Sequence, residues 1–290
     1  MKQGILITAY KNVEQLISIA DFFNDDFSLF IHVDLKSSIP DNDLHILSLH
    51  QNVKLVRKKY KTNWGGLLHL KAILYLATEA LKDDSLDFFH LISGSDFPIQ
   101  SCHHFKKYVE KNVDKNFLHY DKWIPKLEKY GFANRIELFN FYDIFNGKGR
   151  AKYLIKIIQD IQKMLKIKRS FKNTLPPLFG GSTWWSLNRA CLTYVIEYTT
   201  SFPELLQRLK YTFCSEEIYF QTVIMNSPFS KFVVNDALRY IDWRKRNGNS
   251  PAVLDDSDLK MLLSSDKLFA RKFESPTSSS LRLNLFKYLS

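Results

Sequence analysis

Residues 4–34 read GILITAYKNVEQLISIADFFNDDFSLFIHVD. Gly4–Ala9 is a β-favouring run, Val13–Phe23 carries apolar residues at helical spacing, and Ser28–Val33 is a second β-favouring run. The segment therefore predicts a strand, a helix and a second strand, which ends in His32-Val33-Asp34. Strands that alternate with helices indicate an α/β domain with a largely parallel sheet.

The alternation continues along the chain. The further predicted elements are helices over Asp41–Leu49, Leu67–Leu81, Arg189–Thr199, Glu216–Met225 and Asp255–Ser264, and strands over Val53–Val56, Phe88–Ile92, Phe232–Val234 and Leu238–Tyr240. Ligands of open α/β sheets usually lie at the carboxyl ends of the strands. Asp34 and Asp96 follow such ends and are candidates for a site there.

The composition is that of a packed protein. Of 290 residues, 45% are hydrophobic and 14% aromatic, which excludes disorder and leaves only Ser275–Ser280 as a loose stretch. The three cysteines form no CxxC pair, which favours a reducing compartment. No signal sequence and no run of about 20 apolar residues is visible. We therefore expect a cytoplasmic protein, or a peripheral one at the inner face of a membrane.

The net charge of +11 fits nucleic acid, an anionic membrane surface or a phosphate-bearing substrate. Basic residues crowd residues 148–172, where Asp160 is the only acid and apolar residues recur at helical spacing. This segment predicts a basic amphipathic helix. It could pack on the core with a solvated lysine face, contact a membrane, or bind an anionic acceptor or nucleic acid. Because no nucleic-acid-binding motif is present, we expect no nucleic-acid partner.

Two carboxylates and two cations are candidates for chemistry. Ser215 is suited to cap the helix that begins at Glu216. The helix dipole stabilises negative side chains in the first turn, where Glu216 and Glu217 stand. Such acids can be structural, or one of them can act as a general base. Arg271 and Lys272 stand between aromatic residues, where they could bind a diphosphate or lie as solvated charges on an edge strand.

No metal site is visible in the sequence. The adjacent acids Asp25-Asp26, Asp83-Asp84 and Asp255-Asp256 form no Asp-x-Asp after a strand, and the side chains of His103-His104 would point apart. The glycine pairs in Trp64-Gly65-Gly66 and Gly180-Gly181-Ser182 match no phosphate-binding loop. They predict tight turns, or a close approach of the backbone to a ligand.

Eight segments, in the same order, resemble the core-2/I-branching glycosyltransferases, the family that includes the peptide O-xylosyltransferases. They are Ile5–Asn12, Ile31–Lys36, Asn63–Gly66, His90–Ile99, Phe179–Leu187, Glu216–Thr222, Leu238–Trp243 and Leu268–Phe273. Only the region from Trp123 to Lys172 diverges. The sequence shows neither a disulfide framework nor a membrane anchor, and in this it resembles a compact bacterial-type member of the family.

The resemblance implies a GT-A-like α/β fold, with a mixed, mostly parallel sheet flanked by helices. It implies an inverting, metal-independent glycosyltransferase with Glu217 as general base and a UDP-sugar as co-substrate. The implied donor-binding residues are Arg271, Lys272, Asp34, Trp64, Thr183, Trp184, Tyr10 and Lys11, and the implied acceptor-binding residues are Trp243 and Glu216. An arginine that some relatives carry is replaced by Asn249-Ser250-Pro251, so Arg169 or Arg239 could help to neutralise the diphosphate.

The same resemblance predicts one glycosyltransferase domain over residues 1–290. It would consist of a nucleotide-binding half (1–122), a basic helical insert (123–172), an acceptor and catalytic half (173–275) and a C-terminal tail (276–290). The favoured donor sugar is N-acetylglucosamine, with xylose as the alternative, and the acceptor is a glycan or glycolipid in polysaccharide or glycoconjugate synthesis. A non-catalytic sugar- or nucleic-acid-binding protein is the distant alternative.

Overall fold

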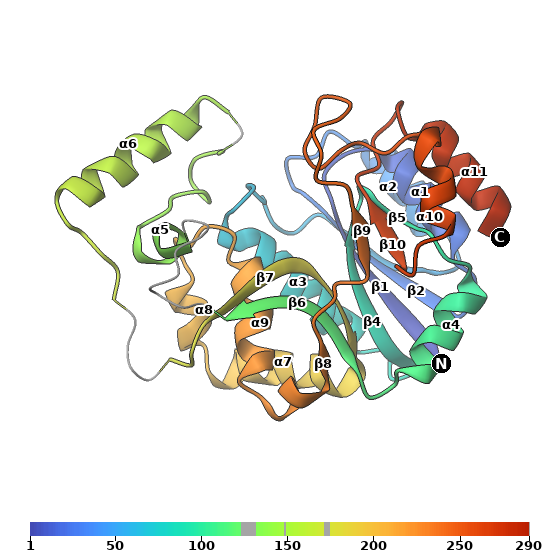
Figure 1. Ribbon diagram of the computed structural model, residues 1–290, viewed down its shortest axis with the longest axis horizontal. Coiled ribbons are helices and arrows are strands. Elements are labelled where there is room, and N and C mark those ends of the chain that lie inside the picture. Colours follow the sequence, from blue (N-terminus) through green and yellow to red (C-terminus); the bar gives the residue numbers. More distant parts are fainter. Residues whose placement is uncertain (123–131, 148, 171–174, 290) are drawn as a thin grey trace.

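The computed structural model describes residues 1–122, 132–147, 149–170 and 175–289, and is built on two sheets (Figure 1). The large sheet has the order β3-β2-β1-β4-β7-β6-β8, and the small one β5-β10-β9. The strands of the large sheet are β1 (Lys2–Ala9), β2 (Phe27–Val33), β3 (Val53–Arg57), β4 (Leu86–Ser93), β6 (Asn116–Lys122), β7 (Phe179–Asn188) and β8 (Val233–Val234). Those of the small sheet are β5 (Asp96–Pro98), β9 (Arg239–Ile241) and β10 (Phe269–Arg271).

The large sheet is mixed. Strands β3, β2, β1 and β4 run parallel to one another, whereas β7 is antiparallel to both β4 and β6. The α/β fold with a mixed, mostly parallel sheet and flanking helices that the sequence predicts is therefore confirmed. Because β6 pairs with β7 and β8, the sheet continues across the predicted boundary at residue 122.

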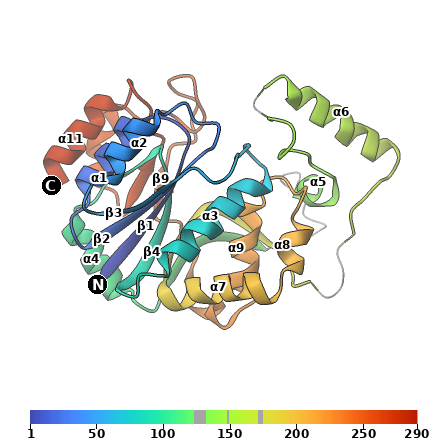
Figure 2. The same ribbon diagram turned by 180° about the vertical axis from the view of Figure 1, so that it is seen from behind.

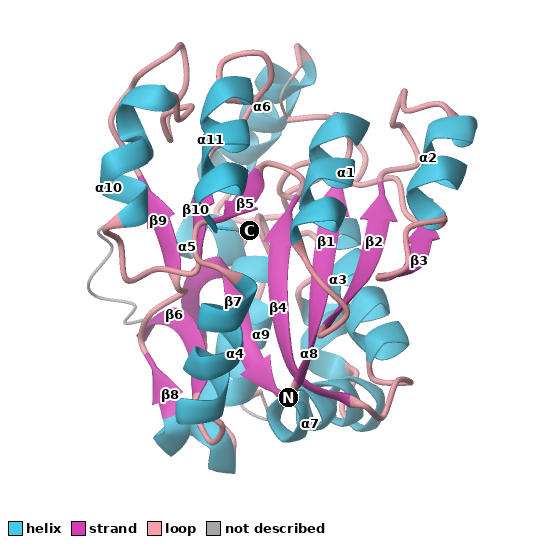
Figure 3. Cartoon of the chain, turned by 90° about the vertical axis from the view of Figure 1, so that its right-hand side faces the viewer, coloured by secondary structure: helices cyan, strands magenta, loops and turns pink. Residues whose placement is uncertain are grey.

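The first strands are apolar on both faces because helices cover both sides of the sheet. Ile5 and Ile7 of β1 belong to one hydrophobic cluster, and Leu6 between them belongs to the other. Figure 2 and Figure 3 show these two helix layers from two sides. The first cluster includes residues of α1 (Val13–Phe22), α2 (Asp41–Ser48), α4 (Cys102–Lys111), α10 (Leu259–Leu263) and α11 (Ser279–Leu289). The second includes residues of α3 (Leu67–Ala80), α7 (Arg189–Ser201), α8 (Glu204–Arg208) and α9 (Glu216–Met225).

The C-terminal residues are more ordered than the sequence predicts. The hydroxyl of Ser278 donates a hydrogen bond of 2.6 Å to the carbonyl oxygen of Leu254. Helix α11 begins at the next residue and buries Leu281 and Leu285 in the first cluster. The prediction of a loose stretch over Ser275–Ser280 is therefore wrong, because the hydrogen bond of Ser278 and the buried leucines of α11 hold this stretch against the protein.

The glycine pair at Gly180-Gly181 lies inside β7, so the expectation of a turn there is wrong. A Cβ on Gly181 would lie 1.9 Å from the carbonyl oxygen of His119 on the neighbouring β6. The close approach is therefore between two strands. By contrast, Gly65 has a φ of 80°, and the turn expected at Trp64-Gly65-Gly66 is present.

Strand β10 lies between β5 and β9, so Arg271 at its end is not on an edge strand. The predicted helix over Asp255–Ser264 is a 3₁₀ turn, η2 (Asp256–Asp258), that continues into α10. Another 3₁₀ turn, η1 (Pro228–Phe232), precedes the two-residue strand β8. These short elements differ from the prediction because contacts with distant segments, more than local periodicity, decide them.

The predicted basic helix is present as α6 (Ala151–Met164), which follows the short α5 (Phe132–Glu137) and stands away from both sheets in Figure 1. Its packing differs from the core-packed interpretation. Only Ile155 and Gln162 of α6 are buried, while Ile157 and Ile161 are exposed. Lys148 and Lys172 of the basic segment lie outside the described residues. No helix in the described part of the chain is long and apolar enough to cross a membrane.

Candidate active site

A cleft of about 1360 Å³ opens at the carboxyl ends of β1, β2 and β4. It lies where ligands of open α/β sheets usually bind. The eleven residues expected to be catalytic, donor-binding or acceptor-binding all line it: Tyr10, Lys11, Asp34, Trp64, Thr183, Trp184, Glu216, Glu217, Trp243, Arg271 and Lys272. The structure thus brings together side chains that are distant in sequence, and the role of each stays a prediction.

Glu217 lies at the first turn of α9 and is held by an arginine. Nη2 of Arg135 donates a hydrogen bond of 2.8 Å to Oε2 of Glu217. The same guanidinium donates to the carbonyl oxygens of Phe213, at 3.1 Å, and Cys214, at 3.2 Å. Arg135 is therefore fixed against the backbone that leads into α9 and, through that anchor, orients the carboxylate in the cleft.

The surroundings of Glu217 favour a proton acceptor. Burial raises the pKa of Glu217, the positive charge of Arg135 opposes the rise, and the negative charge of Glu216 adds to it. A carboxylate with a raised pKa is a stronger base than an exposed one, while the arginine favours its ionised form. Glu217 therefore has the environment expected of a general base.

Ser215 does not cap α9, which corrects the prediction. Its backbone is already helical, with φ of −60° and ψ of −26°, and its side chain accepts no hydrogen bond from the first turn. An N-cap residue normally has an extended backbone that turns its side chain towards the first helical N–H groups. Glu216 and Glu217 therefore begin α9 without the expected hydrogen bond from the side chain of Ser215.

Glu216 is buried beneath the cleft and contacts a histidine of α3. Oε1 of Glu216 lies 3.2 Å from Nδ1 of His69, and Nε2 of the same ring lies 3.3 Å from the hydroxyl of Thr8 at the end of β1. Oε2 of Glu216 has no hydrogen-bond partner among the described residues. The pair joins α9 to α3 and to the strand end, and the unpartnered Oε2 is itself buried.

The cationic side of the cleft is organised by Glu274. This carboxylate accepts Nζ of Lys272 at 2.7 Å and Nζ of Lys11 at 2.5 Å. Burial alone would raise the pKa of Glu274, but the hydrogen bonds from Lys11 and Lys272 outweigh it, and the pKa is lowered. Two lysines from opposite ends of the sequence are thus held together at one wall.

Arg271 is positioned by an acid and a tryptophan. Its Nη1 lies 3.5 Å from Oδ1 of Asp96, and its guanidinium stacks over Trp184, 4.6 Å from the ring centroid. Oδ2 of Asp96 accepts the backbone N–H of Ser93 at 2.5 Å, which ties this acid to the end of β4. Stacking and ion pairing restrict a guanidinium while its other N–H groups stay available to an anion.

Asp34 and Trp64 form the wall next to β2. Asp34 accepts the hydroxyl of Thr62 at 2.6 Å and the N–H of Lys36 at 2.8 Å, so it fixes the two loops that meet there. The half-exposed ring of Trp64 packs edge-on against Phe213, with the centroids 5.0 Å apart. The ring also packs edge-on against Tyr142, with the centroids 6.2 Å apart, and its exposed part lines the cleft.

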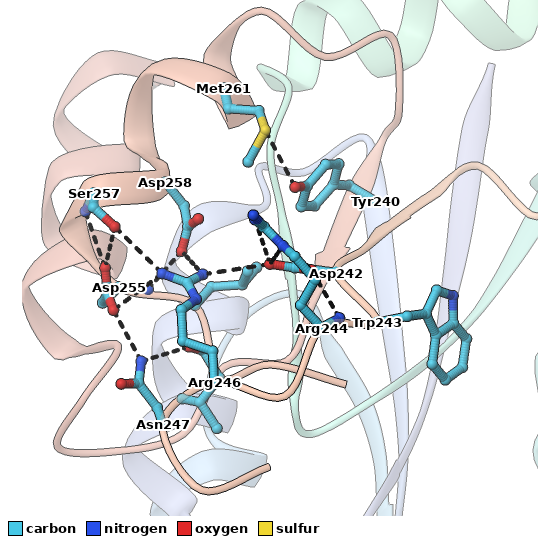
Figure 4. Close-up of polar contacts among 12 residues, drawn as sticks. Tyr240, Asp242, Trp243, Arg244, Arg246, Asn247, Asp255, Ser257, Asp258 and Met261 are labelled. Carbon is cyan, nitrogen blue, oxygen red and sulfur yellow. Dashed lines mark hydrogen bonds and ion pairs between the residues drawn. The ribbon is translucent and has the colours of Figure 1, made fainter. Parts of the chain in front are cut away.

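The loop that carries Trp243 is braced by an ion-pair network (Figure 4). Nη2 of Arg246 lies 2.5 Å from Oδ2 of Asp258 and 3.8 Å from Oδ2 of Asp242. Arg244 also pairs with Asp242, at 2.9 Å. In Figure 4 the indole of Trp243 points away from these charges. The network thus holds the loop, and the exposed indole is presented to the cleft.

The two additional arginines suggested by the sequence do not line the cleft. Arg169 donates to backbone carbonyl groups that include those of Ile136 and Lys210. Arg239 is buried, donates to the carbonyl oxygen of Leu91, and stacks on Phe269 with 4.2 Å to the ring centroid. Both guanidiniums are used in holding the fold, so the suggestion that they help to neutralise a diphosphate is wrong.

Sequence reasoning missed Arg135 and His69. Arg135 belongs to the segment in which the sequence shows no family motif, and His69 stands three residues beyond the Trp-Gly-Gly turn without a motif of its own. A third contributor, Asp143, accepts the N–H groups of Leu67 and Leu68, each at 3.1 Å, and so caps α3. The divergent segment is therefore part of the site wall.

No group of three or more His, Cys, Asp or Glu side chains suited to a metal ion occurs among the described residues. Charged side chains of the cleft include Glu217, paired with Arg135, and Lys11 and Lys272, both paired with Glu274. Metal independence stays a prediction, which a chelator can test.

Together, the fold and the cleft define an α/β protein whose cleft has cationic side chains on one wall and a partly buried glutamate beside them. A family model identifies it more closely. The chain belongs to the Core-2/I-Branching enzyme family, whose model matches residues 6–135 and 126–261. The family resemblance seen in the sequence is therefore confirmed.

Curated relatives include two mammalian proteins. Xylosyltransferase 2 of Rattus norvegicus is 27% identical over 282 residues, which cover 89% of this chain and 30% of the rat protein. Xylosyltransferase 1 of Mus musculus is 25% identical over 303 residues, which cover 95% of this chain and 29% of the mouse protein. The match thus spans less than a third of the length of these relatives.

Solved structures with a similar arrangement include S. aureus TarS 1-349. It has a TM-score of 0.41 and 13% identity, over 80% of this chain and 57% of that chain. The same protein in complex with UDP-GlcNAc gives a TM-score of 0.35 and 14% identity, over 67% of this chain and 47% of that chain.

Proposed function

We propose that the protein is an inverting glycosyltransferase that moves a sugar from a UDP-sugar to a hydroxyl group of a glycan or glycolipid. One observation carries the proposal. The carboxylate of Glu217, in an environment that raises its pKa, shares a cleft with the cations Arg271, Lys272 and Lys11. Membership in the Core-2/I-Branching enzyme family supports the same reaction class.

In the proposed reaction, the carboxylate of Glu217 removes the proton of the acceptor hydroxyl. The acceptor oxygen forms a bond to the anomeric carbon as the bond from that carbon to the diphosphate oxygen breaks. The electron pair of the broken bond leaves with UDP, and Arg271 and Lys272 stabilise the charge that develops there. Because the acceptor attacks the face opposite the leaving group, the anomeric configuration inverts.

The donor wall would be formed by Tyr10, Lys11, Asp34, Trp64, Thr183 and Trp184, and the acceptor side by Trp243 and Glu216. Aromatic rings suit both sides because their apolar faces can pack on sugar C–H groups. Paired lysine and arginine side chains would supply the positive charge that a divalent cation provides in other sites. We therefore propose that no metal cofactor is needed.

Two donor sugars are candidates. The family resemblance leads us to favour N-acetylglucosamine, although its motifs suit both sugars, and the names of the relatives favour xylose. The purified chain should be incubated with a panel of UDP-sugars and glycan acceptors, and UDP release measured with and without EDTA. We expect release with one donor, dependent on acceptor and unchanged by EDTA. Absence of turnover with every UDP-sugar would contradict the reaction class, and loss of activity with EDTA that Mg²⁺ or Mn²⁺ restores would contradict metal independence.

A further inference from the structure

Helix α6 is oriented against the usual rule for a surface helix. Such helices normally turn their apolar stripe towards the core. In α6 and the residue after it, the apolar side chains that recur at spacings of three and four residues are instead exposed, among them Ile157 at 55% and Met164 at 73%. The exposed apolar set is Tyr153, Leu154, Ile157, Ile161, Met164 and Leu165.

The opposite face of α6 is attached to the body largely through amide groups. Oε1 of Gln162 accepts the N–H of Phe139 at 2.7 Å, and its Nε2 donates to the carbonyl oxygen of the same residue at 3.1 Å. Nε2 of Gln159 donates to Oδ1 of Asn140 at 2.5 Å. These bonds, with the buried Ile155, fix which face meets the protein. The apolar stripe is therefore held outwards by specific contacts.

Positive charge flanks this stripe. Lys152, Lys156 and Lys163 lie on one side of the helix and are exposed, and Asp160 is its only acid. An apolar face beside a basic face matches the interface of an anionic lipid bilayer, where apolar side chains enter the acyl boundary and lysines contact the head groups. Two copies packed antiparallel through this face would bring their lysines to the same side, which like-charge repulsion disfavours.

We infer that α6 is a peripheral anchor that lies in the plane of an anionic membrane. The segment that leads into α6 also contacts the cleft: Nδ2 of Asn63 donates to the carbonyl oxygen of Tyr142 at 2.8 Å, and Asn146 lines the cleft. Binding through α6 would therefore hold the opening of the cleft near the lipid surface. The inference does not depend on the proposed reaction, because lipid binding can be measured without turnover.

The test is sedimentation of the full chain with vesicles of phosphatidylcholine alone, or of phosphatidylcholine and phosphatidylglycerol in equal parts. We expect binding to the mixed vesicles only, and weaker binding as salt increases. Ile157→Ser combined with Ile161→Ser should reduce the affinity for mixed vesicles roughly tenfold or more, because two apolar side chains no longer enter the acyl boundary. Lys156→Glu combined with Lys163→Glu should have a comparable effect that high salt removes.

Matched controls lie on other surface helices. Ile46→Ser with Leu283→Ser changes two exposed aliphatic side chains of α2 and α11, and Lys107→Glu with Lys111→Glu reverses two lysines of α4. Both controls should bind mixed vesicles like the wild type. Equal binding to neutral vesicles, or unchanged binding of the α6 variants, would overturn the inference. So would self-association that Ile157→Ser with Ile161→Ser abolishes, in the absence of any vesicle binding.

Discussion

Arg135 and Glu217, 82 residues apart in sequence, form an ion pair of 2.8 Å in the cleft. The arginine comes from a segment in which the sequence shows no family motif, and the glutamate from the segment that carries the proposed base. Because Arg135 also donates to the carbonyl oxygens of Phe213 and Cys214, it can orient one carboxylate oxygen without itself contacting the reacting atoms. We therefore regard Arg135 as a positioning residue.

Replacement of Glu217 by glutamine should nearly abolish transfer while donor binding is retained. The amide keeps the shape of the side chain but cannot accept the acceptor's proton, so we expect kcat to fall by roughly 10²–10⁴-fold with a small change in donor KM. Steady-state UDP release measures both. Glu204→Gln removes a carboxylate from the start of another helix, α8, and should leave kcat unchanged. A Glu217→Gln variant with wild-type kcat would exclude Glu217 as the base.

Arg135→Met should move the acid limb of the kcat–pH profile to higher pH. The positive charge of Arg135 lowers the pKa of Glu217, so its removal raises that pKa further and protonates the base at a higher pH. Arg135→Lys, which retains the charge, should restore the limb towards its wild-type position. A variant that loses activity equally at every pH, with no shift of the limb, would show that Arg135 has only a structural role.

Lys272→Ala should impair both the binding of the donor and the rate of transfer. Negative charge on the diphosphate grows in the transition state, so loss of this ammonium should raise donor KM and lower kcat, with a combined loss in kcat/KM of roughly tenfold to hundredfold. The matched control is Lys267→Ala. It removes a lysine paired with Asp236 at 2.7 Å in the same part of the chain, but one that does not line the cleft. Equal effects of the two substitutions would contradict the proposed role of Lys272.

The sequence predicts the main sheet well where strands are long and apolar. β1, β2 and β4 are buried on both faces, so their composition alone marks them. The strand β6 was not predicted, because Asn116–Lys122 mixes polar and apolar residues and is stabilised by pairing with β7, far along the chain. The periodicity of α6 shows that it has two faces, but only the contacts of Gln162 and Gln159 show which one meets the protein.

The candidate site was predictable where it follows family motifs. Seven of the eight segments carry the eleven residues that the structure brings together in one cleft. The partners that orient them were not predictable, since His69 lies 147 residues from Glu216 and no local pattern joins them. Glu274 illustrates the same limit: its role depends on Lys11, at the other end of the chain, reaching the same carboxylate as Lys272.

Two buried histidines should make the protein less stable as the pH falls below about 6.5, the ordinary pKa of histidine. Burial lowers the pKa of His32 to about 4 and that of His90 to about 3. In the folded protein Nε2 of His32 accepts the N–H of Tyr60 at 3.0 Å, which requires an unprotonated nitrogen. Between pH 6.5 and 4 the unfolded chain therefore binds protons that the folded chain does not. Each histidine should lower the free energy of unfolding by about 1.4 kcal/mol for each pH unit.

Urea unfolding measured at several pH values between 7 and 4.5 gives this slope directly. His90→Gln should remove the contribution of one histidine and reduce the slope by about 1.4 kcal/mol per pH unit, whatever its effect on stability at pH 7. His103→Gln, which changes an exposed histidine of α4, should leave the slope unaltered. Because the readout is a slope, a variant that is merely less stable still tests the idea. An unchanged slope in His90→Gln would mean that His90 takes up its proton equally readily in the folded and unfolded chains.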